Sequence, residues 1–168
     1  MMLVFLQIFS LMSLYGLMTA GSTIKRYRQR WQHEHQFLLT KQRLRHIEKY
    51  WVTTAPSCQI PVILATSIAK KPISWWQQYA CSDKLNRLNY YFVVEVIDKE
   101  PCGVLEKKLF NQIVTVEYRR ITLLSLSNET NGIRILLQST IATLMDSASP
   151  CQGKPHRVIL GRQGWREI

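Results

Sequence analysis

Residues 1–30 read MMLVFLQIFSLMSLYGLMTAGSTIKRYRQR, an uncharged segment that runs directly into a basic one. Residues 1–24 carry no charged side chain, whereas residues 25–49 carry eight Lys or Arg and two Glu. No proline interrupts either segment. We therefore predict one long helix over residues 3–52, about 75 Å long at a rise of about 1.5 Å per residue. Its first half suits apolar surroundings and its second half suits water.

The uncharged half has the length of a membrane anchor. Residues 3–20 would rise about 27 Å as a helix, just enough to cross the apolar core of a bilayer. Five small or polar residues interrupt this run: Gln7, Ser10, Ser13, Gly16 and Thr19. We predict that residues 1–24 form a hydrophobic transmembrane stem, with the chain crossing the inner membrane once. A signal peptide cleaved at Ala20 is the alternative, although no basic region precedes the apolar run as such a peptide requires.

The basic half begins with a collar of cations, Lys25, Arg26, Arg28 and Arg30. Anionic lipid headgroups are the nearest expected partner of this collar, and nucleic acid is the second. An ordinary solvated helix face is the third reading, and it stays open because charge runs are usually solvated.

Residues 25–55 are predicted to continue the helix as an amphipathic segment. Phe37, Leu44 and Trp51 recur every seven residues with Ile47 between them, a spacing typical of a coiled-coil-like seam. Pro56 should end the helix, since it lacks the backbone donor and clashes with the preceding turn.

Four cysteines, Cys58, Cys81, Cys102 and Cys151, all follow the helix. Their even number and wide spacing favour two disulfides in an oxidising compartment. Three pairings exist, and we favour Cys58–Cys81 with Cys102–Cys151 because each closes a separate loop region; four free thiols are the alternative. The positive-inside rule would place the basic collar in the cytoplasm. We follow the cysteines instead and expect a periplasmic head.

Residues 56–168 are predicted to form a globular β head that begins with a loop region at 56–89. Within that loop, Trp75 and Trp76 should start a short helical turn ending near Cys81. The paired tryptophans could form a ligand platform, but packing against a core is the commoner use of such rings. Segments rich in β-branched and aromatic residues predict four antiparallel strands, at residues 90–97, 114–127, 133–142 and 157–166. The expected fold class is therefore α+β, a long helix packed on a four-stranded sheet.

No pattern of catalytic or cofactor-binding residues is found. His33, His35, His46 and His156 have no spacing that would place a metal between them. Glu95, Glu106 and Glu117 lack the spacing of an acid–base pair, and the seven glycines form no phosphate loop. We therefore expect no enzymatic activity, no cofactor and no metal.

Two parts of the chain resemble PilX-type minor pilins of type IV pilus assembly systems. Residues 3–11, LVFLQIFSL, and residues 14–17, LYGL, look like the hydrophobic stem of that family. Residues 120–122, RIT, followed by residues 134–140, RILLQST, are similar to its last hairpin. The resemblance implies a pilin-like fold in which residues 1–24 pack in the pilus core. The residues expected to make this packing are Leu3, Leu6, Gln7, Leu11, Leu14, Gly16 and Leu17, of which Gln7 and Gly16 suit close helix contacts.

The function implied by the resemblance is structural. The chain would prime or cap pilus assembly and so support pilus biogenesis, twitching motility or adhesion. Its partners would be other minor pilins, the major pilin, the inner membrane and, if a leader precedes Met1, prepilin peptidase. After assembly it would lie in the pilus fibre or at its tip.

Two alternatives share this architecture. One is a minor pseudopilin of a type II secretion system. The other is a pilus-tip module that binds DNA or a host surface through Arg119, Arg120, Arg134 and Lys154, for which a strong dependence on salt is expected.

Overall fold

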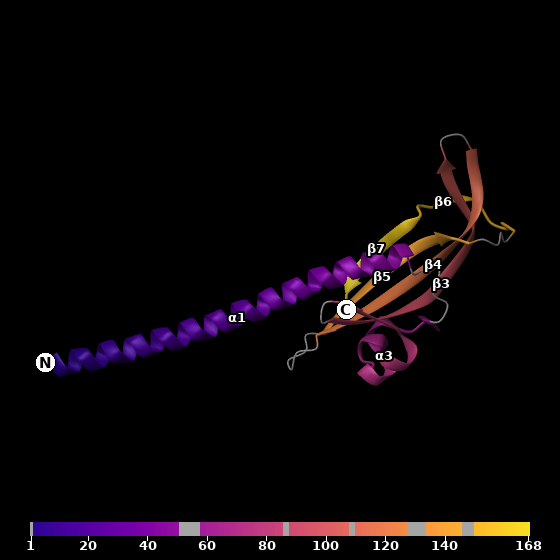
Figure 1. The fold of residues 1–168 in the computed structure, drawn as a ribbon. Helices are drawn as coiled ribbons and strands as arrows, with labels where there is room; N and C mark the ends of the chain where they lie inside the picture. The colour runs from indigo at the N-terminus through magenta and orange to yellow at the C-terminus, as the bar shows by residue number, and fades with distance from the viewer. Residues whose placement is uncertain (1, 51–57, 86–87, 108–109, 128–133, 146–149) are drawn as a thin grey trace. The chain divides into compact units, whose positions relative to one another are not determined.

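The computed structural model describes residues 2–50, 58–85, 88–107, 110–127, 134–145 and 150–168. The chain is an α+β protein with two compact units, Met1–Leu39 and Thr40–Ile168. Helix α1 (Met2–Tyr50) forms all of the described part of the first unit, and its last turns belong to the second (Figure 1). A single long helix is confirmed. The stop predicted at Pro56 and the seam residue Trp51 lie outside the described residues.

The membrane-spanning anchor is a wrong prediction. Among the described residues, no helix combines the length and the apolar character needed to cross a membrane. The predicted single-pass location in the inner membrane is therefore corrected.

The second unit is built on a seven-stranded sheet, not the four strands predicted. Its strands are β1 (Gln59–Ile60), β2 (Cys81–Leu85), β3 (Leu88–Lys107), β4 (Phe110–Ser127), β5 (Arg134–Leu144), β6 (His156–Arg157) and β7 (Gly161–Glu167). Strands β3, β4, β5 and β7 lie side by side and antiparallel, as predicted (Figure 1). Strands β1 and β6 pair with β3 in parallel, so the sheet is mixed.

The three strands missed by the prediction share one role. Strand β2 pairs with residues 88–92 of β3, β1 with Val94 and Glu95, and β6 with Gly103 and Val104. Each short strand thus covers one part of the same β3 edge, where exposed backbone groups would otherwise invite pairing with another chain. β1 and β6 have two residues each, and β2 reads CSDKL, so none of them carries an alternating apolar pattern.

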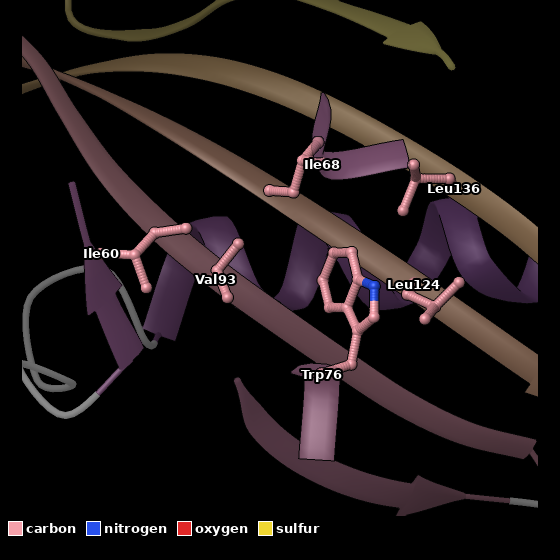
Figure 2. Packing of buried hydrophobic residues seen from close by; sticks show 6 residues of the cluster. All are labelled: Ile60, Ile68, Trp76, Val93, Leu124 and Leu136. Atoms are coloured by element: carbon pink, nitrogen blue, oxygen red, sulfur yellow. The ribbon is translucent and has the colours of Figure 1, made fainter. Parts of the chain in front are cut away.

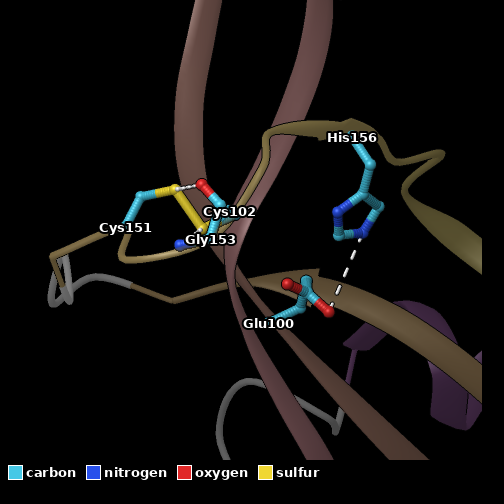
Figure 3. The surroundings of a disulfide bond; sticks show 5 residues. All are labelled: Glu100, Cys102, Cys151, Gly153 and His156. Atoms are coloured by element: carbon cyan, nitrogen blue, oxygen red, sulfur yellow. Dashed lines mark hydrogen bonds and ion pairs between the residues drawn. A yellow bond between two sulfur atoms is a disulfide. The ribbon is translucent and has the colours of Figure 1, made fainter.

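Both disulfides link segments along this edge of β3. Their pairing, Cys58 with Cys81 and Cys102 with Cys151, is the one that we favoured from the sequence. Cys58–Cys81 joins the residue before β1 to the first residue of β2. Cys102–Cys151 joins β3 to the segment that leads into β6 (Figure 3). Gly153 lies against this second bridge, its backbone N–H 3.4 Å from Cys102 Sγ. The prediction of two disulfides is therefore confirmed.

Helical segments cover both faces of the sheet. Cross-strand pairing places Val94, Ile121, Ser139 and Trp165 on one face. The last turns of α1 lie on this face. The Lys41 ammonium nitrogen lies 4.6 Å from the centroid of the Trp165 ring, and the Arg162 guanidinium donates hydrogen bonds to the Glu48 carboxylate. Leu44 and Ile47 are fully buried there, so this part of the predicted seam packs inside the chain itself.

The other face lies under α2 (Ala65–Ala69) and α3 (Ile73–Tyr79). Trp76 of α3 is completely buried against Val93, Leu124 and Leu136 of three adjacent strands (Figure 2). Trp75 beside it makes an edge-to-face contact with the Trp76 ring at 5.3 Å. The predicted helical turn is confirmed, and Trp76 serves as a core residue and not as a ligand platform.

Candidate assembly surface

The stem residues lie along the first half of α1 with their apolar side chains uncovered. Leu11, Leu14 and Leu17 each expose more than half of their surface, and Gln7 and Gly16 are exposed as well. Leu3 and Leu6 belong to the same helix, but their side chains fall outside the described residues. Large apolar side chains exposed along a helix in this way are characteristic of a segment that is covered by a partner.

The hydroxyl residues at the end of the stem, Thr19, Ser22 and Thr23, are bonded within the helix. Thr19 Oγ1 donates to the carbonyls of Tyr15 and Gly16, both at 2.9 Å. Thr23 Oγ1 and Ser22 Oγ donate to the carbonyl of Thr19 at 2.8 and 2.9 Å. These bonds remove the need for water at the hydroxyls, so the segment around Gly21 is compatible with packing against other apolar helices.

The basic collar follows the stem without a break. Lys25, Arg26, Arg28 and Arg30 are all exposed on α1. Two large aromatic side chains, Tyr27 and Trp31, are exposed among them. The Trp31 ring stacks on His35, with 5.4 Å between centroids.

In the head, Arg120 is committed to a buried ion pair. Its guanidinium donates to both carboxylate oxygens of Glu95 on the neighbouring strand, at 2.8 and 2.7 Å. Glu95 has no exposed surface. The hydrogen bond to Glu95 raises the pKa of Arg120, against the opposing effect of burial. Arg120 therefore fastens the sheet and is not available to an anionic ligand.

The other cations of the predicted DNA surface do not join Arg120. Arg119 directly precedes Arg120 on β4, so its side chain lies on the opposite face, where it pairs with Glu117 at 2.6 Å. Arg134 donates to the carbonyls of Ala69 and Lys71, at 2.8 and 3.4 Å, at the end of α2. Lys154 is exposed near the Cys102–Cys151 bridge. The four side chains form no single basic surface.

The described residues contain no group of three His, Cys, Asp or Glu side chains that could hold a metal ion. His156 approaches only Glu100, at 3.8 Å (Figure 3). Among the other polar groups, burial raises the pKa of Tyr90 above 10.0, while the nearby charge of Arg43 lowers it.

Sequence reasoning missed the Glu95–Arg120 pair, although it singled out both residues. It treated Glu95 as an isolated carboxylate and Arg120 as a contact for an anion. The pair depends on the register Glu95↔Arg120 between β3 and β4. Two irregularities of the β3–β4 pairing, between Val96 and Asp98 and between Glu100 and Gly103, shift the register before it reaches this pair, so the sequence pattern alone gave no signal for it.

Comparison with known protein families, with curated proteins and with solved structures found no match to this chain. The fold and the exposed helix therefore carry the functional argument.

Proposed function

We propose that this chain is an assembly subunit of a type IV pilus-like filament, in the manner of a minor pilin. The apolar first half of α1 packs among similar helices in the filament core, and the β head lies outside that core. The single observation that carries the proposal is the exposure of the stem side chains, among them Leu11, Leu14 and Leu17, along one unbroken helix.

Three further features support this proposal. The hydroxyls of Thr19 and Thr23 are bonded within the helix, so these two donors stay satisfied when the helix packs against apolar neighbours. The head is closed by two disulfides and by helices on both faces, and so needs no partner to complete its core. The resemblance of residues 3–11, 14–17, 120–122 and 134–140 to PilX-type minor pilins points to the same role.

Site-specific photo-crosslinking in living cells tests the packing of the stem. A benzophenone amino acid at Tyr15, which is exposed in the stem, should crosslink to helical stems of other filament subunits. The same group at Lys84, exposed on β2 of the head, is the matched control and should not do so. Capture of stems from the head position alone, or from neither position, would contradict the proposal.

Deletion of the gene tests the outcome for the cell. Surface filaments should be lost or sharply reduced, and should return when the gene is supplied in trans. Unchanged filaments together with lost protein export would favour the secretion pseudopilin, whereas unchanged filaments and unchanged export would reject both roles.

A further inference from the structure

A second apolar feature of α1 starts within the predicted stem and continues beyond it. Leu17, Ile24, Trp31 and Leu38 recur at intervals of seven residues, and Tyr27 falls between two of them. At about 100° per residue, the five side chains occupy about 80° of the helix circumference. We call these five residues the outer seam.

The outer seam is open to solvent along its whole length. Ile24 is 68% exposed, Trp31 64% and Leu38 62%. A heptad of large apolar residues at this exposure is the pattern that accepts one partner helix, with knobs entering holes between the side chains. Leu44 and Ile47 are three residues apart, like Ile24 and Tyr27, but they are buried against the sheet. They show that apolar residues at this spacing on α1 can be fully covered by a neighbouring surface.

The charged residues beside the outer seam determine which sign of charge a partner helix should carry. Arg28 and Arg30 follow Tyr27 by one and three residues, so they lie on the two flanks of the seam. Between residues 25 and 38 the chain has four Lys or Arg and a single acid, Glu34. Flanking charges of this kind select partners of opposite sign in paired helices.

A second copy of this chain is a poor occupant. It would bring four more cations, and only one more acid, to the same stretch of helix. Like charges held along paired helices are destabilising and act against self-association. A helix with Asp or Glu on its flanks would instead neutralise the collar.

We infer that the outer seam binds an amphipathic helix of a different chain, one with an apolar heptad stripe flanked by acidic residues. The inference rests on the proposed function only in taking that helix to belong to another filament subunit. On this inference, the basic collar favours pairing with a different subunit over pairing between two copies of this chain.

Two synthetic helical peptides test this directly against the full chain in a non-ionic detergent. They share one apolar heptad stripe and differ only in carrying Glu or Lys at the flanking positions. Fluorescence anisotropy of the labelled peptides should show the Glu peptide binding at least about tenfold more tightly than the Lys peptide. Equal binding of the two peptides, or binding of neither, would overturn the inference.

Three variants assign the effect to the seam and the collar. Trp31→Asp should weaken binding of the Glu peptide at least about tenfold, because it buries a charge in the apolar contact. Gln29→Asp, which adds the same charge away from the seam, should change binding little. The double variant Arg28→Glu with Arg30→Glu should reverse the preference toward the Lys peptide. Circular dichroism checks that each variant keeps its helix content.

Sedimentation of the full chain without peptide tests whether a second copy of this chain binds the outer seam. A dimer that Trp31→Asp dissociates would make a second copy the natural partner and would reject the inference. The peptide measurements do not depend on filaments, so normal filaments in a deletion strain would remove the proposed function and leave the peptide preference standing.

Discussion

Arg120 and Glu95 form a buried, doubly hydrogen-bonded ion pair in the head. Arg120 Nε and Nη2 lie 2.8 and 2.7 Å from the two carboxylate oxygens of Glu95. Nη2 also donates to the carbonyl of Ile63 at 2.5 Å, and the Ile63 N–H donates to Glu95 Oε1 at 2.7 Å. The pair therefore joins β3 to β4 and fastens the connection between β1 and α2. Such a buried charge is tolerated because it is both paired and hydrogen-bonded.

Arg120→Ala should lower the free energy of unfolding by about 3–5 kcal/mol, because it leaves the Glu95 carboxylate buried and unpaired. Urea denaturation measures this change. Arg134→Ala removes an exposed arginine that bonds two carbonyls and should cost about 1 kcal/mol. Replacing both Glu95 and Arg120 by Leu should recover most of the loss, since no lone charge remains. A cost for Arg120→Ala no larger than that for Arg134→Ala would contradict the role given to the pair.

The Cys102–Cys151 bridge should stabilise the head and hold β6 in place. Replacing both cysteines by Ser frees a loop with a sequence separation of 49, and a loop of this length corresponds to about 4 kcal/mol in the chain-entropy model. Because the Val158 N–H donates to the carbonyl of Val104 at 3.1 Å beside the bridge, its amide exchange should rise more than that of the β4–β5 pairing.

The other disulfide supplies the matched control for that measurement. Removing Cys58–Cys81, with a separation of 23, should cost a similar or smaller free energy, about 3 kcal/mol. It should leave the exchange of Val158 unchanged relative to the surrounding amides. Equal acceleration of Val158 in both double variants would show that neither bridge acts locally on β6.

The sequence predicted the elements that carry their own pattern. The long helix, the four main strands and the turn at Trp76 were found because apolar spacing or β-branched runs mark them. The short strands β1, β2 and β6 were not found, since each is formed by pairing with β3 and not by local preference. The membrane anchor was a wrong prediction, since none of the described helices is both long enough and apolar enough to cross a bilayer.

The candidate surface shows the same division. The stem and the collar are visible in the sequence because they are continuous along one helix. The ion pair between Arg120 and Glu95 depends on the register between β4 and β3. The two residues are 25 positions apart in the sequence, and no local pattern specifies this register. The predicted DNA surface combined Arg119 with Arg120 because they adjoin in sequence, whereas neighbours in a strand point to opposite faces.

Trp76 should respond differently to two substitutions. Its indole Nε1 is buried and has no hydrogen-bond acceptor within the described part of the chain. Trp76→Ala opens a cavity between α3 and the sheet and should cost about 3–5 kcal/mol. Trp76→Phe should cost at most about 2 kcal/mol, since the unpaired N–H that it removes carries a penalty of about 1–3 kcal/mol. Thermal unfolding compares the two, with the partly exposed Trp75→Phe as control. Equal losses for Phe and Ala at position 76 would contradict the packing described in Figure 2.

Tyr90 should make the head sensitive to alkaline pH. Burial raises its pKa above 10.0, so the folded chain keeps the phenol proton at a pH where the unfolded chain releases it. The stabilising contribution is therefore complete below pH 10.0 and is lost as the pH rises through the pKa of the folded state. Unfolding free energies measured from about pH 8 to about pH 11 should fall more steeply for the wild-type chain than for Tyr90→Phe, by at most about 1.4 kcal/mol per pH unit. Tyr27→Phe, at an exposed position of α1, should follow the wild-type curve. Parallel curves for wild type and Tyr90→Phe would show that the buried phenol does not couple folding to alkaline pH.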